Sequence, residues 1–138
     1  MTAEHTHSAP DKLTRNQALV FHVLEDSERP LGAYDLLDAL RGDGMRSPLQ
    51  VYRALDKLMA FGLVHRLESI NSFVACHGHH HHDHGITGFA ICETCGQVTE
   101  FTDPVVSERL EAWAQATGFK ASKAAIELRG TCGKCASA

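Results

Sequence analysis

Apolar side chains in the first half of the chain recur at helical spacing in three separate segments. In the first segment, which begins near residue 13, two apolar pairs lie four residues apart, as in an amphipathic helix. Similar stripes lie in residues 33–40 and in residues 48–61. A proline-containing break at residues 28–30 separates the first two segments, and the glycine-rich turn at residues 42–44 ends the second. The pattern predicts three short helices.

The third of these helices has the clearest start in the sequence. Ser47 is a favourable N-cap, Pro48 fits the first helical position, and Gln50 can close a capping box. Gly62 is expected to stop the helix. The apolar residues that fall together on its buried face are Val51, Leu55 and Leu58.

Residues 63–76 have the pattern of a β-hairpin, with a turn near residues 69–72. Three short helices followed by a small hairpin are the layout of a winged helix-turn-helix.

A histidine-rich run at residues 76–85 interrupts this pattern and marks a predicted domain boundary. Beyond it, the pattern predicts two strands flanking a tight turn, a helix that begins at Asp103-Pro104 and ends at Gly118, and a final strand. The three strands are expected at residues 88–91, 97–101 and about 124–129.

The predicted fold class is therefore α+β, with an N-terminal winged helix-turn-helix followed by a small α/β dimerisation domain. We expect the DNA-binding domain at residues 1–75, of which residues 1–11 form a polar tail. The histidine-rich hinge is expected at residues 76–87, and the dimerisation and metal-binding domain at residues 88–138.

Composition narrows the class of protein further. The 138 residues are 22% charged and 43% hydrophobic, which is typical of a globular chain. No apolar run is long enough to span a bilayer, and the N-terminus lacks a signal-peptide core, so we expect a cytoplasmic protein with no membrane partner. The net charge of −4 argues against a broadly basic nucleic-acid coat but permits a local basic face.

The ten histidines and five cysteines are unusual for a chain of this length. Cys92 and Cys95 form one C-x-x-C pair, and Cys132 and Cys135 form another. Four thiolates are the ligand set of a closed, tetrahedral structural zinc site. A thioredoxin-like dithiol is the alternative, but the second pair and the lack of an adjacent βαβ pattern favour zinc.

A second metal site is indicated by the hairpin. His65 and Cys76 are equally distant from Ile70-Asn71, so they are expected to lie directly opposite each other, with Cβ atoms about 4.5–5.5 Å apart. Further ligands are available from Glu100 and from the hinge. The hinge ligand is expected to be His84, with His82 as the alternative. Histidine, cysteine and carboxylate together favour zinc over harder ions. The alternative for the hinge is a solvated histidine run that only scavenges metal.

The third predicted helix carries polar residues on the side away from its apolar stripe. These are Gln50, Arg53 and Lys57, flanked by Tyr52. In a winged helix this helix enters the major groove, where arginine suits guanine and glutamine suits adenine. A solvated helix face is the alternative without the winged-helix layout. One monomer offers few base contacts, so a homodimer on a near-palindromic operator is expected.

Together these residues resemble the ferric uptake regulator (Fur) superfamily. The resemblance rests on Val51-Tyr52-Arg53-Ala54-Leu55, His82-Asp83-His84, Cys92-x-x-Cys95-Gly96, Glu100-Phe101 and Cys132-x-x-Cys135, and it covers about residues 13–135. The segments at residues 33–40 and 64–76, with Cys76, are most similar to the zinc uptake regulator (Zur) branch.

The resemblance implies a zinc-responsive transcriptional repressor of zinc-uptake genes that binds operator DNA as a dimer. It also implies about two Zn²⁺ ions per subunit, one structural and one regulatory. The four C-x-x-C cysteines would hold the structural ion. The implied ligands of the regulatory ion are His65, Cys76, Glu100 and a hinge histidine. The sequence departs from the family pattern in three ways: Arg15 replaces a proline, Gln50 replaces a threonine, and residues 85–88 lengthen the hinge.

Three rival functions follow from the same residues. An iron or peroxide sensor of the same superfamily is disfavoured by Cys76. A zinc hydrolase needs an open coordination position, which a complete four-ligand set does not leave, so no enzyme activity and no small-molecule substrate are expected. A zinc-buffering protein would not explain the polar face of the third helix.

Overall fold

The computed structural model describes residues 13–76 and 86–137, and the chain divides into two units between residues 79 and 80. The predicted hinge at residues 76–87 lies mostly outside the described residues, so its bounds stay a prediction. In the part of the chain that is described, no helix has the length and apolar character needed to cross a membrane.

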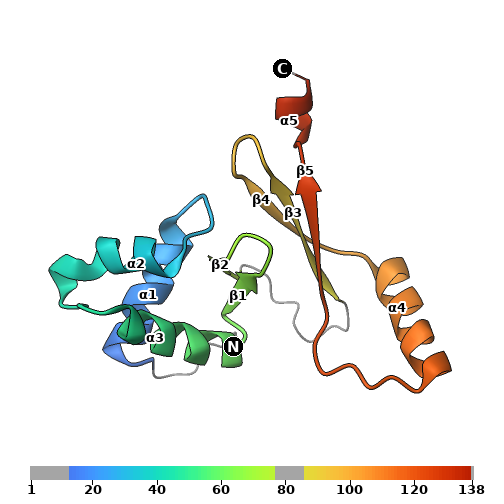
Figure 1. Cartoon of the computed structure of the whole chain (residues 1–138), viewed down its shortest axis with the longest axis horizontal. Coiled ribbons are helices and arrows are strands. Elements are labelled where there is room, and N and C mark those ends of the chain that lie inside the picture. Colours follow the sequence, from blue (N-terminus) through green and yellow to red (C-terminus); the bar gives the residue numbers. More distant parts are fainter. Residues whose placement is uncertain (1–12, 77–85, 138) are drawn as a thin grey trace, which may run out of the picture. The chain divides into compact units, whose positions relative to one another are not determined.

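Three helices and a two-stranded hairpin make up the first unit (Figure 1). The helices are α1 (Arg15–Asp26), α2 (Ala33–Leu40) and α3 (Pro48–Ala60), with a 3₁₀ turn, η1 (Arg41–Asp43), after α2. The predicted start of α3 is confirmed, because the Ser47 hydroxyl accepts from Gln50 N–H and the Gln50 side chain bonds back to Ser47 N–H. Thr14 and Gln17 form a similar capping box at α1, which the apolar pattern alone did not indicate.

The hairpin is built from β1 (Val64–Leu67) and β2 (Ser72–Ala75). Its turn contains Asn71 in the left-handed region, with φ 52°, where asparagine is better tolerated than most residues. The strand register pairs His65 with Val74. The prediction that His65 lies directly opposite Cys76 is therefore wrong, because the pairing is centred between residues 69 and 70 rather than between residues 70 and 71.

A third backbone segment widens the hairpin. Leu31, between α1 and α2, exchanges two hydrogen bonds with Phe73, at 3.1 and 2.8 Å. The hairpin is thereby tied to the helices and is held as the wing of a winged helix-turn-helix.

One apolar core joins the helices and the hairpin of this unit. Val51, Leu55 and Leu58, the predicted buried face of α3, are fully buried. Each such side chain contributes about 1.5–3 kcal/mol when it leaves water. The core fixes the orientation of α3, and its opposite face stays in solvent.

The second unit is a three-stranded sheet with one long helix and one short one (Figure 1). Its elements are β3 (Thr87–Cys92), β4 (Val98–Thr102), α4 (Pro104–Thr117), β5 (Ala125–Gly130) and α5 (Gly133–Ala136). The strand order is β4-β3-β5, and β3 runs antiparallel to β4 but parallel to β5. The four-residue helix α5 was not predicted.

Gly88, on the central strand, is covered by the aromatic ring of its cross-strand partner Phe101. A Cβ atom at residue 88 would lie 2.3–2.7 Å from three atoms of that ring. Only glycine permits this packing, which fixes the pairing of β3 with β4 beside Glu100.

The helix α4 begins at Asp103, whose carboxylate accepts from the backbone N–H groups of Val105 and Val106. Ser107 is buried, and its hydroxyl accepts from Ile86 N–H at 2.8 Å. The predicted apolar face of α4 is present but exposed. Val106, Leu110 and Trp113 are 38%, 43% and 57% exposed. Each unit combines helices with a small sheet, so the fold class is α+β, as predicted.

Candidate metal centre and nucleic-acid interface

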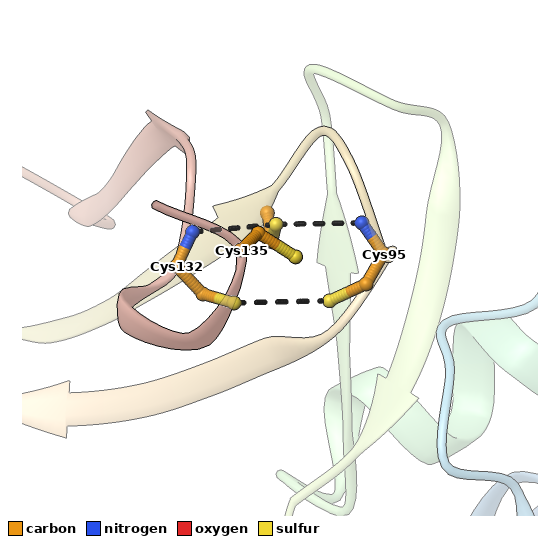
Figure 2. Close-up of side chains that lie close together, drawn as sticks. Cys95, Cys132 and Cys135 are labelled. Atoms are coloured by element: carbon orange, nitrogen blue, oxygen red, sulfur yellow. Dashed lines mark hydrogen bonds between the residues drawn. The ribbon is translucent and has the colours of Figure 1, made fainter. Parts of the chain in front are cut away.

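The sheet topology of the second unit brings the two C-x-x-C pairs together. Cys92 ends β3, and Cys95 lies in the turn that follows, whereas Cys132 and Cys135 follow β5. Because β5 runs parallel to β3 and Gly130 pairs with Cys92, both pairs lie at the same end of the sheet. Figure 2 shows the sulfur atoms of Cys95, Cys132 and Cys135 pointing toward one another.

The four sulfur atoms fit a tetrahedral zinc ion. All four lie within 4.8 Å of one another, and the Sγ atoms of Cys95 and Cys132 are 3.9 Å apart. Thiolates bound 2.3 Å from a tetrahedral zinc ion lie about 3.8 Å from one another. All five cysteines of the chain belong to the described residues, and none of them forms a disulfide there.

Backbone N–H groups prepare Cys92 to carry negative charge. The N–H groups of Cys95, Cys132 and Thr94 donate to its Sγ atom at 3.4, 3.3 and 3.4 Å. These hydrogen bonds, chiefly those from Cys95 and Cys132, lower the pKa of Cys92 from 9.0 to about 6, against the opposing effect of burial. The C-x-x-C-G turn is the sequence signal for such donors, but only the structure identifies the donor that comes from Cys132.

In the other C-x-x-C pair, the pKa values of the two thiols are shifted in opposite directions. Cys135 lowers the pKa of Cys132, first through its backbone N–H and then through its thiol. The hydrogen bond with Cys132, together with burial, raises the pKa of Cys135 itself to about 12. Cys135 therefore keeps its proton until a cation displaces it. Four sulfur ligands, two of which (Cys92 and Cys132) have a lowered pKa, fit a structural zinc ion.

The hairpin brings together two residues of the second predicted site. Cys76 follows β2, and its N–H donates to Leu63 O at 2.8 Å, which continues the ladder past Ala75. His65 and Cys76 are thus diagonal neighbours on one face of the hairpin, and their ligand atoms lie within 4.8 Å. A diagonal pair is further apart at Cβ than a direct pair, but long side chains can still meet.

The remaining predicted ligands lie elsewhere in the chain. Glu100 is on β4 of the second unit, where it pairs with Phe89 and is half-buried. His82 and His84 lie outside the described residues. The hairpin therefore contributes two ligands of suitable chemistry, an imidazole and a thiol.

The solvent face of α3 carries three of the predicted DNA-binding residues. Arg53 and Lys57 are exposed, and Tyr52 is 37% exposed. Neither basic side chain forms an ion pair with any residue of the described ranges. Their charges are available to a ligand outside the unit.

Gln50 is engaged differently from the other three. Its Oε1 atom accepts from the backbone N–H groups of Arg46 and Ser47, at 2.7 and 3.2 Å. Bidentate recognition of adenine needs both the carbonyl and the NH₂ group of the side chain. Because the carbonyl caps α3, only the NH₂ group of Gln50 can contact a base without breaking the cap.

Arg66 gives the wing its shape. Its guanidinium donates to Asn71 Oδ1 at 2.8 Å and lies over the ring of Phe73, 5.9 Å from the centroid. The structure shows that Arg66 braces the two strands of the hairpin.

Comparison with known proteins gives consistent matches. The model of the ferric uptake regulator family matches residues 9–129. The chain is 37% identical over 125 residues to the zinc uptake regulation protein of Escherichia coli K12, which covers 90% of this chain and 72% of that protein. It is 34% identical over 128 residues to the ferric uptake regulation protein of Legionella pneumophila, with 90% of each chain covered.

Solved structures agree with these matches. The crystal structure of holo XcZur is 44% identical, with a TM-score of 0.81 over 92% of this chain and 88% of that one. A zinc uptake regulator complexed with zinc and DNA is 35% identical, with a TM-score of 0.84 over 91% of this chain and 84% of that one.

Proposed function

Because the chain belongs to the ferric uptake regulator family, we propose that it is a zinc-responsive transcriptional repressor that binds operator DNA as a dimer and blocks transcription of zinc-uptake genes. Members of this family are transcription regulators, so the chain is a regulator and not an enzyme. The observation that carries the choice of zinc is the proximity of the His65 and Cys76 ligand atoms on one face of the hairpin. We expect such a regulator to act in the cytoplasm.

The chemistry of that pair favours zinc over iron. A cysteine thiolate is a soft ligand, and with imidazole it suits Zn²⁺ better than the harder divalent ions. Two similar proteins support this choice: the Escherichia coli zinc uptake regulation protein and the zinc uptake regulator complexed with zinc and DNA.

Each subunit would hold about two zinc ions with different roles. The four-cysteine cluster is closed and would hold a structural ion. The second ion would be held by His65, Cys76, Glu100 and His84, with His82 as the alternative hinge ligand. These ligands come from both units of the chain, so the second ion would govern how the units are arranged.

This arrangement supplies a switch. When zinc is abundant, the second site fills, and the two winged helices of a dimer are held at the spacing of two half-sites. When zinc is scarce, the site empties and the affinity for DNA falls. To move the equilibrium almost completely from one state to the other, zinc must bind the DNA-binding state more tightly than the other state by about 5.5 kcal/mol.

DNA recognition is assigned to α3 of each subunit. Arg53 would contact guanine, Lys57 and Tyr52 would contact the backbone or base edges, and Gln50 would contribute only through its NH₂ group.

Dimerisation is assigned to the exposed apolar face of α4, which contains Val106, Leu110 and Trp113. Apolar side chains this exposed are typical of a surface that a partner covers.

Metal analysis of purified wild type and of Cys76→Ser tests the zinc assignment. Wild type should contain about two zinc ions per subunit and Cys76→Ser about one, because only the second site loses a ligand. In gel-shift assays, chelation of the second ion should weaken wild-type DNA binding, and Cys76→Ser should bind weakly at any zinc concentration. Zinc-dependent binding of normal strength by Cys76→Ser would overturn the role of that residue.

A matched variant separates metal sensing from base contact. Arg53→Ala should keep about two zinc ions per subunit but lose about 1–3 kcal/mol of DNA-binding free energy if Arg53 contacts a base. Equal metal content and unchanged affinity would remove Arg53 from the interface.

The relatives named ferric uptake regulation proteins motivate one rival, an iron sensor of the same family. Competitive loading with Zn²⁺ and Fe²⁺ under anaerobic conditions distinguishes the two functions. If Fe²⁺ but not Zn²⁺ restores DNA binding to protein whose second site has been emptied, the iron-sensor function is favoured.

A further inference from the structure

Leu49 lies at the centre of the solvent face of α3. It is 56% exposed, although the other leucines of α3, Leu55 and Leu58, are fully buried. On a helix, residues three and four positions apart are neighbours, so Leu49 adjoins both Tyr52 and Arg53. An apolar side chain therefore lies between two of the residues assigned to DNA recognition.

The position of Leu49 along the helix is also informative. It follows Pro48 in the first turn of α3, and the cap formed by Ser47 and Gln50 holds this turn rigidly. In helix-turn-helix proteins, the N-terminal residues of the recognition helix contact base edges. A single exposed leucine is ordinary on a protein surface, but here it lies on the part of α3 that would enter the groove most deeply.

We propose that Leu49 is a specificity-determining residue that contacts the C5-methyl group of a thymine in the major groove of each operator half-site. This inference rests on the proposed DNA-binding function. Thymine is the base that presents a methyl group in the major groove, and apolar side chains recognise it by removing that methyl group from water.

The helix geometry places this thymine near the base that Arg53 contacts. Leu49 and Arg53 are separated by four residues, or about 6 Å along the helix axis. Successive base pairs are about 3.4 Å apart. The thymine should therefore lie within about two base pairs of the guanine contacted by Arg53.

The expected effect of one methyl group is small but measurable. Burial of one such group corresponds to about a fourfold change in the dissociation constant for each half-site. A dimer that engages two half-sites should change about fifteenfold.

The test uses a duplex recovered from a random-sequence library by selection with the zinc-loaded wild-type chain. Each thymine is replaced by deoxyuridine together with its symmetry-related thymine in the other half-site, which removes only the two methyl groups. Binding of wild type, Leu49→Ala and the control Phe61→Ala is then measured at one salt concentration. Phe61 is also exposed, at 42%, but it lies beyond the C-terminal end of α3.

Wild type and Phe61→Ala should lose about fifteenfold in affinity at one symmetry-related thymine pair, whereas Leu49→Ala should bind the thymine and deoxyuridine duplexes equally. Thermal unfolding should confirm that Leu49→Ala is folded, since the residue is exposed and alanine favours helix.

Two results would overturn the inference and are distinguishable from failure of the proposed function. If wild type selects and binds a duplex but no thymine position is sensitive to the methyl group, or if Leu49→Ala keeps the wild-type sensitivity, Leu49 does not recognise thymine. If zinc-loaded wild type selects no duplex, the DNA-binding function itself fails, and the inference fails with it.

Discussion

The exposed face of α4 gives a quantitative prediction for dimerisation. Leu110 is 43% exposed in the isolated subunit. Full burial of a leucine side chain contributes about 1.5–3 kcal/mol, so covering the remaining exposed part contributes about 1 kcal/mol per subunit. A two-fold interface contains the residue twice. Leu110→Ala should therefore weaken the dimer by about 2 kcal/mol, or roughly 30-fold in dissociation constant.

The chain contains a probe for this equilibrium. Trp113 is the only tryptophan of the sequence, and it lies one turn from Leu110 with 57% of its surface exposed. Dilution of the zinc-loaded protein should shift its fluorescence toward longer wavelength as subunits separate. Sedimentation equilibrium gives the dissociation constant independently.

A matched control distinguishes this interface from general effects of removing surface apolar area. Tyr34→Ala also removes an exposed side chain, 66% exposed, but from α2 of the other unit. It should leave the dissociation constant unchanged. If Leu110→Ala also dimerises with wild-type affinity, α4 is not the interface and the reasoning from its exposed face is refuted.

Three further predictions follow from individual contacts. Gly88→Ala should destabilise the second unit by about 1–3 kcal/mol in calorimetric unfolding, because its Cβ would overlap the ring of Phe101, and the added substitution Phe101→Ala should recover part of the loss if this contact is the cause. Gln50→Ala should lower the free energy of unfolding by about 1 kcal/mol through loss of the α3 cap, and a variant with wild-type stability in denaturant titration would contradict the assigned hydrogen bonds. Zinc binding by the four-cysteine cluster at pH 7 should release fewer than four protons per ion, since Cys92 with a pKa of about 6 is already mostly ionised whereas Cys135 with a pKa of about 12 must give up its proton. Calorimetry in buffers of different ionisation enthalpy measures this number, and release of all four would contradict the lowered pKa of Cys92.

Local chemistry explains which parts of the fold were predictable. The start of α3 follows from Ser47, Pro48 and Gln50, whose side chains act within one turn of the helix, and this prediction is confirmed. The approach of the two C-x-x-C pairs was also predictable, because the metal chemistry of four cysteines demands it, although the parallel pairing of β3 with β5 that produces it depends on contacts distant in sequence.

The register of the hairpin could not be predicted from the symmetry of the sequence about its turn. Asn71 adopts a left-handed conformation in the hairpin turn, and the register differs from the symmetric one by two residues, so Val74 rather than Cys76 faces His65. Gln50 was correctly predicted as a cap, and its predicted contact with a base stays a prediction, now limited to the NH₂ group because the carbonyl group is engaged in the cap. The sequence pattern is compatible with more than one hairpin register and with more than one role for Gln50, and it does not determine which one the fold adopts.

The parallel alignment of β5 with β3 has a consequence for synthesis of the protein. A ribosome makes Cys92 and Cys95 well before Cys132 and Cys135, and a nascent chain that carries only the first pair has half of a metal cluster. Metal-assisted closure of the second unit therefore waits until almost all of this sequence has been translated. Premature termination before Cys132 would leave a chain that cannot complete the cluster.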